Sequence, residues 1–406
     1  MKILLLSASP VIPANNGAKI RIFATNTILT RRHEITMVSV QEGGAARPAV
    51  ESTPPWKDYQ VGYSISHRWQ TILKSCFSRY CYGQVKVLDS TYQAFVEELL
   101  KKEDFDVIWL ATFNMTPYFE RCIQGKYTRP LVLLDLHNVD EMYYGSFIRS
   151  DVSWLVRLYA AFEVMKSKRM QRIWFPRFDA ILCVSDEDLK VTQSYLNGHT
   201  QAWLVPNGVD VDYFMPAPYP LVSPNPAPVL VFGGSMDVVM NQDAVRWFVS
   251  TILPILQKQI PEIQFWAVGR NPPASLVELD GKNGVRVTGT VPDVREYYRQ
   301  ADVFIIPSRF GSGTKLKAME AMSMGLPVVS TSIGVQGIHV ESGRHLCIAD
   351  EPAEFAANVI ELLHDRPRAA RMGVEGRQQV VAHYSWEGIV HQIEDRLSEL
   401  LQDRQR

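Results

Sequence analysis

The sequence predicts an α/β protein made of two doubly wound, Rossmann-like domains. The chain has 406 residues, more than a single hydrophobic core usually organises. Short apolar runs alternate with longer amphipathic segments, which is the pattern of parallel sheets covered by helices. The alternation stops at a proline-rich stretch and then starts again. We therefore expect two domains that face each other across a cleft, because doubly wound sheets bind ligands at the carboxyl ends of their strands.

The composition limits the class of protein further. Hydrophobic residues make up 46% of the chain, charged residues 21%, and the formal net charge is −1, which fits a soluble globular protein with no general attraction to nucleic acid. The 5 cysteines are scattered, without a C-x-x-C pair, so a reducing cytosol is expected. The first apolar run is too short for a signal peptide, and no run is long enough to cross a membrane. We therefore expect a cytoplasmic protein, which could also dock at the inner face of the membrane.

The first domain is predicted to span residues 1–207. Its strands are apolar throughout, and amphipathic segments at 90–103 and 151–176 read as helices between them. The strands are expected at 2–7, 34–40, 106–111, 130–137, 180–185 and 202–207.

The linker is predicted at 208–228, because residues 216–228 (PAPYPLVSPNPAP) are too rich in proline for a helix or a central strand. The second domain then covers 229–384, and the amphipathic helix at 385–402 is expected to pack back on the first domain. Strands of the second domain are expected at 229–234, 263–269, 285–290, 302–308 and 327–332, with helices around 241–258, 292–300, 352–365 and 367–381.

The loop after the first strand, SPVIPANNGAKIR (9–21), is long and ends at Gly17 before a helix that carries Lys19 and Arg21. A glycine without a side chain lets the backbone approach a ligand closely. The alternative is an ordinary turn followed by solvated basic residues. We favour a ligand-binding loop, because it lies at the predicted cleft.

His137 ends another apolar strand, in DLHNVDEMYY (135–144). A histidine at this place can hydrogen-bond a hydroxyl or take part in proton transfer. A structural, hydrogen-bonded histidine is the competing interpretation.

The stretch FGSGTKLKAMEAMSMGLPVVS (310–330) carries the strongest signal. A glycine turn leads into a helix with Thr314 as its expected N-cap, and the free N–H groups there, with Lys315 and Lys317, could hold a diphosphate. Glu320 lies one helical turn beyond Lys317. A simple surface ion pair between these two residues is the alternative, but it leaves the glycines unexplained.

Other motifs are absent or weaker. The chain contains no GxxxxGK[ST] phosphate loop, no nucleophile elbow and no His/Cys cluster with metal spacing. The acidic pair in SDED (185–188) reads most simply as a capping box at a helix start, and DVD (210–212) as a turn.

Several of these segments together resemble the retaining, GT-B-fold glycosyltransferases of family 4. VPNGVDVDYFMP (205–216) looks like the interdomain signature of that family, and ADVFIIPS…KAMEAMSMGLPVVSTSIG (301–334) looks like its donor-site signature. The opening strand, the Gly17 loop, RRHEITMVSV (31–40) and FDAILCVSDED (178–188) also fit. The G-S-G-T-K-L-K loop is similar to a bacterial subgroup linked with exopolysaccharide assembly.

The resemblance implies a nucleotide-diphosphate sugar donor, such as a UDP- or GDP-sugar, and a glycan or lipid-linked acceptor, with no metal or other cofactor. Glu320 matches the second glutamate of the E-x7-E motif, which holds the ribose, and His137 would lie near the reacting sugar. His137, Lys315 and Glu320 are the implied catalytic residues. The implied donor-binding residues are Gly17, Arg270, Thr290, Val291, Pro292, Ser312, Gly313, Thr314, Lys315, Lys317 and Glu320.

One departure from the family pattern matters for function. The first glutamate of the motif is replaced by Ser312, so the identity of the sugar does not follow from the resemblance. The expected function is sugar transfer in bacterial surface or exopolysaccharide synthesis. A non-catalytic partner subunit of the same fold, and a nucleotide-sugar 2-epimerase that acts without an acceptor, stay open as alternatives. A nicotinamide dehydrogenase fits worse, because no G-x-G-x-x-G follows the first strand.

The segment 153–178 mixes tryptophans with Lys166, Lys168, Arg169, Arg172 and Arg177. Such a basic amphipathic helix could dock on anionic lipid at the periphery of a membrane. A core helix with a solvated basic face is the alternative.

Overall fold

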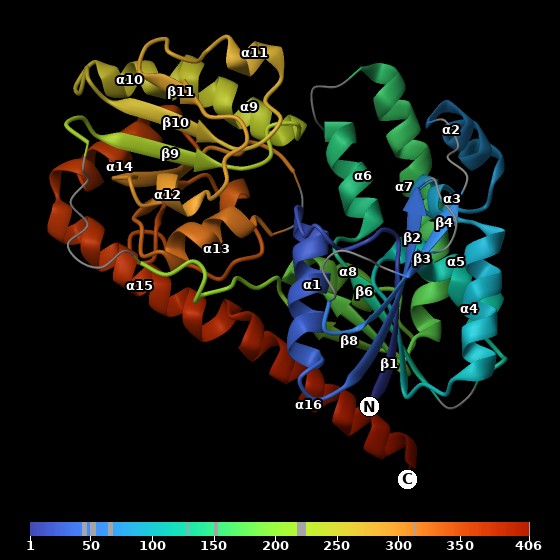
Figure 1. Ribbon diagram of the computed structural model, residues 1–406. Coiled ribbons are helices and arrows are strands. Elements are labelled where there is room, and N and C mark those ends of the chain that lie inside the picture. The colour runs from blue at the N-terminus through green and yellow to red at the C-terminus, as the bar shows by residue number, and fades with distance from the viewer. Residues whose placement is uncertain are drawn as a thin grey trace. The chain divides into compact units, whose positions relative to one another are not determined.

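The structure is a computed structural model of the chain, shown in Figure 1. It describes residues 1–42, 47–48, 54–63, 68–127, 130–149, 153–216, 225–311 and 314–405. The chain forms two compact units: Met1–Pro206 together with Val390–Arg406, and Asn207–Ile389.

The first unit contains an 8-stranded sheet in the order β3-β4-β2-β1-β5-β6-β7-β8. All neighbouring strands are parallel except β3, which pairs antiparallel with β4 at the edge. Helices cover both faces (Figure 1). The strands are β1 (Lys2–Ser7), β2 (Glu34–Glu42), β3 (Arg47–Pro48), β4 (Lys57–Tyr63), β5 (Val107–Leu110), β6 (Leu131–Leu136), β7 (Ala180–Cys183) and β8 (Gln201–Leu204). The α-helices are α1 (Gly17–Leu29), α2 (Arg68–Phe77), α3 (Tyr82–Val87), α4 (Ser90–Lys102), α5 (Thr116–Tyr118), α6 (Asp140–Arg149), α7 (Trp154–Trp174) and α8 (Asp186–Gln193).

The second unit contains a 6-stranded parallel sheet in the order β11-β10-β9-β12-β13-β14. Its strands are β9 (Val229–Gly233), β10 (Gln264–Val268), β11 (Val285–Val287), β12 (Val303–Ile306), β13 (Val328–Ser330) and β14 (Cys347–Ile348). Its α-helices are α9 (Val239–Trp247), α10 (Leu253–Gln257), α11 (Ala274–Val277), α12 (Arg295–Tyr298), α13 (Leu316–Ser323), α14 (Pro352–His364), α15 (Arg366–Tyr384) and the start of α16 (Trp386–Gln405).

The central strands are apolar throughout because both of their faces are covered. In β9, Leu230 and Phe232 pack into one core cluster, whereas Val229 and Val231 pack into another. Every residue of this strand is buried. The prediction of two doubly wound Rossmann-like domains is confirmed at the level of each sheet.

Three strands and five α-helices, among them α5, α6 and α11, were not predicted from the sequence. β3 and β14 have two residues each, and β4 reads KDYQVGY, which has too few apolar residues to stand out. Helices α2 and α3 are the other two unpredicted helices. Several expected strands are shorter in the structure, including 202–207, whose strand β8 ends at Leu204.

The chain passes between the two units twice. Val209, just after the first passage, forms a parallel bridge with Ser385, just before α16. The Val209 N–H donates to the carbonyl of Tyr384 at 2.8 Å. α16 then begins in the second unit and continues into the first, whose C-terminal part starts at Val390.

Among the residues that the structure describes, no helix combines the length and the apolarity needed to cross a bilayer.

Candidate functional site

The second unit has its topological switch point between β9 and β12. From β9 the chain winds outward through β10 and β11, and it then returns to β12 on the other side of β9. Loops that follow two such strands diverge at the carboxyl edge of the sheet and leave a crevice where ligands bind. The two loops here are Gly234–Val238, which leads into α9, and the glycine loop before α13.

Lys317 connects the elements that follow these two strands. From the first turn of α13 its Nζ donates to Oδ1 of Asn241 on α9 at 2.7 Å. The same ammonium lies 3.9 Å from the centroid of the Phe232 ring at the end of β9. A side chain at Gly234 would place its Cβ 2.8 Å from Nζ, so the lysine needs a glycine at this position. Burial, assisted by Lys315, lowers the pKa of Lys317 to about 7, although Glu320 acts in the opposite direction.

Lys315 lies beside the other glycine loop. A Cβ at Gly311, whose φ is +122°, would lie 3.3 Å from the Lys315 Nζ and 2.3 Å from Sδ of Met240. Burial lowers the pKa of Lys315 to about 8. Two ammonium groups with lowered pKa values favour an anionic ligand, because a bound anion would restore the charge that burial opposes.

Glu320 faces the interior of the same unit. Oη of Tyr298, on α12, donates to Oε2 of Glu320 at 3.5 Å. A Cβ at Gly233 would lie 1.9 Å from this hydroxyl, so the end of β9 must be glycine for Tyr298 to reach the glutamate. Burial raises the pKa of Glu320 to about 7, against the lowering effects of Lys317 and Tyr298. A carboxylate held in this way can accept hydrogen bonds from the hydroxyls of a ligand.

Arg270 is brought to the same edge at the end of β10. Its Nε donates to Oγ of Ser235 at 2.6 Å, and its carbonyl accepts from the N–H of Met236 at 2.8 Å. A Cβ at Gly269 would lie 1.7 Å from the carbonyl oxygen of Gly234, which shows how closely the two loops approach. Arg270 therefore braces the loop that carries Gly234.

Other predicted residues lie at the edge of the same sheet. Thr290, Val291 and Pro292 follow β11, two strands from β9, and Thr290 and Pro292 are exposed, while Val291 packs against the apolar cluster that contains Tyr298. Ser312 and Gly313 lie outside the described residues.

The expectation that Thr314 caps α13 was wrong. The N-cap is Lys315, whose extended backbone (φ −89°, ψ 98°) precedes the first helical residue, Leu316. Within the described part of the chain, Oγ1 of Thr314 is buried and has no hydrogen-bond partner. A hydroxyl in this state at a helix start is available to a ligand.

Four further residues of the cluster were not predicted from the sequence: Gly233, Gly234, Asn241 and Tyr298. A signal was present, because two adjacent glycines follow the apolar run VLVF. Nothing in the sequence alone connects them with Lys317, since 76 residues separate the lysine from Asn241.

In the first unit, His137 lies at the carboxyl end of β6 and lines a cavity of about 280 Å³. Its Nε2 is buried and makes no hydrogen bond to any described residue. Burial lowers the pKa of His137 to about 4; Arg21 adds to this effect and Asp135 opposes it. The loop after it is fixed by Asp188, whose Oδ1 accepts from the N–H of Val139 at 3.0 Å. A neutral imidazole with an unpaired nitrogen suits a hydrogen bond to a ligand better than a proton shuttle at neutral pH.

We predict that His137 stays neutral until the pH falls to about 4. Burial disfavours the imidazolium, so its ring carbon and nitrogen resonances in NMR spectra should not move between pH 8 and pH 5. A midpoint for His137 near pH 6.5 would contradict the description of its site.

Polar side chains line the same cavity, among them Asn16, Lys19, Asn114 and Asp140. Burial, with the nearby Glu163 adding to it, raises the pKa of Asp140 to about 7. A second cavity of about 490 Å³ shares Ser9 and Asn114 with the first and extends along α3 past Gln41, Gly83 and Lys86. Amides, hydroxyls and charged groups along two adjoining cavities suit a ligand rich in hydroxyl groups.

The loop predicted to bind a ligand contributes to this cavity only in part. Gly17 is the exposed first residue of α1, while Asn16 and Lys19 line the cavity. Arg21 is buried, so the alternative of solvated basic residues does not hold for it. It is 2% exposed and forms an ion pair with Asp135, with Nη2 and Oδ1 2.9 Å apart. A side chain that can bind a carboxylate with two nitrogens is suited to such a buried pair.

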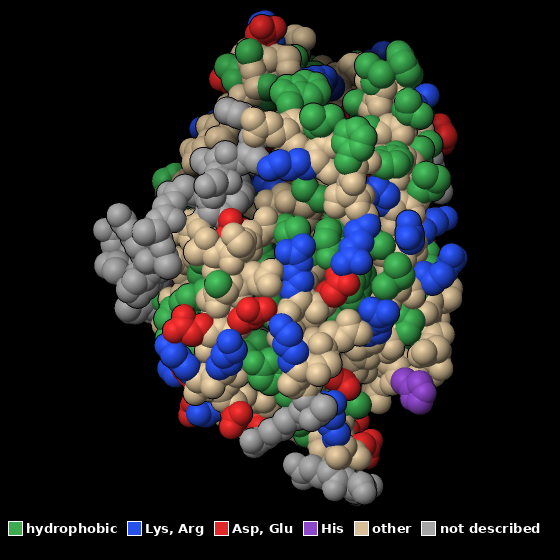
Figure 2. All heavy atoms as spheres, turned by 90° about the vertical axis from the view of Figure 1, so that its right-hand side faces the viewer, with side chains coloured by type: hydrophobic (Ala, Val, Ile, Leu, Met, Phe, Trp, Pro, Cys, Tyr) green, Lys and Arg blue, Asp and Glu red, His purple; other side chains and the backbone are tan. Residues whose placement is uncertain are grey.

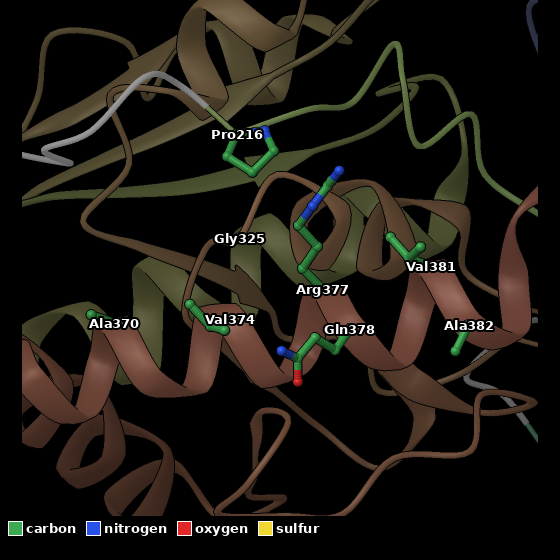
Figure 3. A pocket seen from close by; sticks show the side chains of 8 residues that line it. All are labelled: Pro216, Gly325, Ala370, Val374, Arg377, Gln378, Val381 and Ala382. Atoms are coloured by element: carbon green, nitrogen blue, oxygen red, sulfur yellow. The ribbon is translucent and has the colours of Figure 1, made fainter.

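An apolar groove of about 500 Å³ lies along α15 of the second unit (Figure 3). Its walls include Pro216, Val374 and Val381, and Nη1 of its single lining arginine, Arg377, donates to the carbonyl of Ser323. Apart from Arg377, Gln378 is the polar side chain in its described lining, so the cluster of two lysines and a glutamate at the switch point is the better candidate.

Within the described residues, no group of three or more His, Cys, Asp or Glu side chains is placed to hold a metal ion.

Part of the second unit matches a known protein family. Residues 227–365 match the family described as Glycosyl transferases group 1. An uncharacterised 44.6 kDa protein in the cps region of Klebsiella pneumoniae is 27% identical over 237 residues, which are 56% of this chain and 58% of that protein. The phosphatidyl-myo-inositol mannosyltransferase of Mycobacterium leprae is 27% identical over 231 residues, 55% of this chain and 59% of that protein. The matches thus span less than two thirds of these relatives.

Solved structures match over the whole length. Sucrose-phosphate synthase (tll1590) from Thermosynechococcus elongatus has a TM-score of 0.73 at 16% identity, covering 99% of this chain and 100% of that one. Anabaena Alr3699/HepE, solved in complex with UDP and glucose, has a TM-score of 0.64 at 15% identity, covering 98% and 99%. The likeness shows that the chain has the GT-B fold, as the sequence predicts.

Proposed function

We propose that this protein is a retaining glycosyltransferase of family 4 that moves a sugar from a nucleotide-diphosphate sugar to a glycan or lipid-linked acceptor. The observation that carries the proposal is the cluster at the switch point, where Lys315, Lys317 and Glu320 meet the glycine-rich end of β9. The match of residues 227–365 to Glycosyl transferases group 1 supports it independently.

The two lysines would bind the diphosphate of the donor. The backbone at Gly234 and Gly311 can approach the phosphates closely, since neither residue has a side chain in the way. Glu320, held by Tyr298, would accept hydrogen bonds from the ribose hydroxyls. The lysine charges take the place that a metal ion has in other nucleotide-sugar sites, so we propose transfer without a metal.

The reaction breaks the bond between the anomeric carbon and the diphosphate oxygen. The acceptor oxygen bonds to the anomeric carbon on the same face, and its proton passes to the departing diphosphate. Negative charge accumulates on the diphosphate in the transition state, and fixed cations directed at that charge lower the barrier. No separate base is required for this route, in keeping with the low pKa of His137.

The acceptor side is proposed to be the pair of cavities in the first unit. His137 Nε2 would hydrogen-bond an acceptor or sugar hydroxyl, while Asn114 lies between the two cavities and can contact a ligand in either. We propose a role in bacterial surface polysaccharide synthesis, and the names of two relatives support this role. One lies in a cps region, and the other, LpsB of Rhizobium meliloti (27% identical over 236 residues, 52% of this chain), is a lipopolysaccharide core mannosyltransferase.

Donor binding tests the proposal without knowledge of the acceptor. Calorimetry with UDP-, GDP- and ADP-sugars, in the absence of metal, should identify one donor that binds clearly best. Glu320→Ala should weaken that donor by about 10- to 100-fold, because hydrogen bonds to a charged group are worth about 1.5–3 kcal/mol.

The exposed Glu278→Ala, in the same unit, is the matched control and should leave donor affinity unchanged. Failure of every donor to bind would favour the alternative of a non-catalytic subunit. Conversion of the bound donor into an isomer without an acceptor would instead identify an epimerase.

A further inference from the structure

We infer that α2 and α7 of the first unit form a docking surface for an anionic lipid bilayer. Large apolar side chains stand exposed on both helices: Trp69 (80%), Leu73 (62%) and Phe77 (87%) on α2, and Trp154 (71%), Leu158 (63%) and Met165 (65%) on α7. Soluble proteins rarely expose several such side chains side by side unless they form an interaction surface.

The helical spacing places these side chains on one face of each helix. In α2 the residues are four apart, and in α7 Trp154, Leu158 and Met165 lie within about 40° of one another around the axis. The same face of α7 continues with Lys168, Arg169 and Arg172, which are all exposed. α2 therefore presents an apolar face outward. The outer surface of α7 changes from apolar to basic along the helix, and Leu155 and Val156 are exposed as well in its first turn.

The two helices are held together by a buried polar network. Nζ of Lys166 on α7 donates to the carbonyl of Ser75 on α2 at 2.7 Å and lies 3.4 Å from Oε1 of the fully buried Glu163. Oγ of Ser75 and the hydroxyl of Tyr159 are 3.0 Å apart. Lys166, which the sequence placed among the membrane-facing cations, is thus a buried structural residue. The network fixes the exposed faces relative to each other.

Charge identifies the occupant of this surface as anionic lipid. Glu163 is the only acidic residue in either helix, and it is buried, so the exposed surface of α2 and α7 has cations but no carboxylates. A second copy of the chain would bring like charges together across a two-fold contact, which opposes self-association. Tryptophan and phenylalanine beside lysine and arginine match the boundary between headgroups and acyl chains. Figure 2 shows apolar side chains gathered in the upper part of this side of the molecule, with lysine and arginine below.

The docking surface is linked to the cavities of the same unit. Oε2 of Glu163 accepts from the N–H of Tyr82, the first residue of α3, at 2.8 Å. Gly83 and Lys86 on α3 line the larger cavity. A bilayer held against α2 and α7 would therefore lie next to the helix that forms the cavity wall, which is the placement that a lipid-linked acceptor requires. The docking itself does not depend on the proposed donor chemistry.

Vesicle co-sedimentation with the full-length protein tests the inference. The wild type should bind phosphatidylcholine vesicles that contain phosphatidylglycerol, bind pure phosphatidylcholine vesicles far less, and be released by high salt. Lys168→Glu/Arg169→Glu/Arg172→Glu should weaken binding at low salt by about 100-fold or more, since each cation near an anionic surface contributes a factor of about five. Trp69→Ser/Phe77→Ser should weaken it by at least about tenfold through the loss of buried apolar area.

Matched changes in the second unit are the controls. Lys258→Glu/Lys282→Glu/Arg299→Glu and Val277→Ser/Val374→Ser alter exposed cations and exposed valines there, and should leave vesicle binding unchanged. Circular dichroism and donor affinity should stay at wild-type values in all four variants, which separates this test from that of the proposed function. The inference is overturned by equal binding to neutral vesicles, by no vesicle binding, or by variants on α2 and α7 that bind as the wild type does. The inference would also be overturned if the wild type were a dimer and Trp69→Ser/Phe77→Ser made it a monomer, because the surface would then be a dimer interface.

Discussion

Replacing Lys317 by methionine is expected to lower kcat/KM for the best nucleotide-sugar donor by about 10²- to 10³-fold, the loss typical for removal of one preorganised group that stabilises transition-state charge. Methionine keeps most of the volume of the side chain, so the change removes the ammonium and its hydrogen bond to Asn241 with little loss of packing. Steady-state kinetics, or donor binding where the acceptor is unknown, measure the effect.

The folded protein should tolerate this substitution well. Because burial lowers the pKa of Lys317 to about 7, its charged form is disfavoured in the folded state, and methionine should leave the melting temperature unchanged or higher. Below pH 7, Lys317 of the folded wild type carries a charge that burial disfavours. The stability of Lys317→Met relative to the wild type should therefore be greatest below pH 7. This difference should disappear as the pH rises toward 10.5, the ordinary pKa of lysine.

Proton uptake separates an electrostatic role of Lys317 from a merely structural one. At pH 8 the free lysine is mostly neutral, and a bound diphosphate should raise its pKa, so donor binding should take up as much as about one proton. Calorimetry in buffers with different ionisation enthalpies measures this number. Lys317→Met should abolish the Lys317 contribution, and the exposed Lys282→Met should not. Lys315, whose pKa is about 8, should contribute to the uptake in both proteins, so an uptake that is not reduced at all in Lys317→Met would remove Lys317 from the diphosphate site.

Breaking the ion pair between Arg21 and Asp135 should be the most destabilising single change among those considered. Arg21→Met leaves the carboxylate of Asp135, which is 3% exposed, without its charged partner. It also removes the donor to the carbonyls of Val205 and Pro206, which Nη1 of Arg21 reaches at 3.1 Å each. Loss of one partner of a buried pair typically costs about 3–5 kcal/mol, which urea or thermal unfolding can measure.

Two comparison variants make this result interpretable. Arg344→Met removes the cation from two exposed ion pairs, with Glu341 and Glu375, and should change stability by only about 1 kcal/mol. Arg21→Met/Asp135→Leu replaces both charges by apolar groups, and should recover part of the loss. If Arg21→Met lowered the free energy of unfolding no more than Arg344→Met does, the ion pair between Arg21 and Asp135 would not be buried in solution.

The main strands could be predicted from the sequence because their residues pack on both faces of a sheet. Runs such as KILLLS and VLVFG are apolar at successive positions, and this signal is local. The fold follows from the order of such runs, since parallel strands require helices between them. Strand β4 shows the limit: KDYQVGY has polar residues at alternate positions and was not recognised.

The candidate site was predictable only on one side. Lys315, Lys317 and Glu320 stand within six residues of one another, next to a glycine turn, so their association is visible in the sequence. Asn241 and Tyr298 reach them only because the strand order places β9 beside β12. The burial of Arg21 was not predicted for the same reason, because its partner lies 114 residues away and exposure cannot be read from an isolated basic residue.

The bridge between Val209 and Ser385 makes the second unit a module of the chain. It holds the two ends of the second unit next to each other, so that residues 207–389 are connected to the remainder of the chain in the manner of an inserted domain. Domains with adjacent ends can be inserted into or excised from a host chain without a change in its topology. Recombination could therefore exchange the whole second unit, with Lys315 and Lys317, in one step. The helices α2 and α7 and the two cavities of the first unit would stay intact.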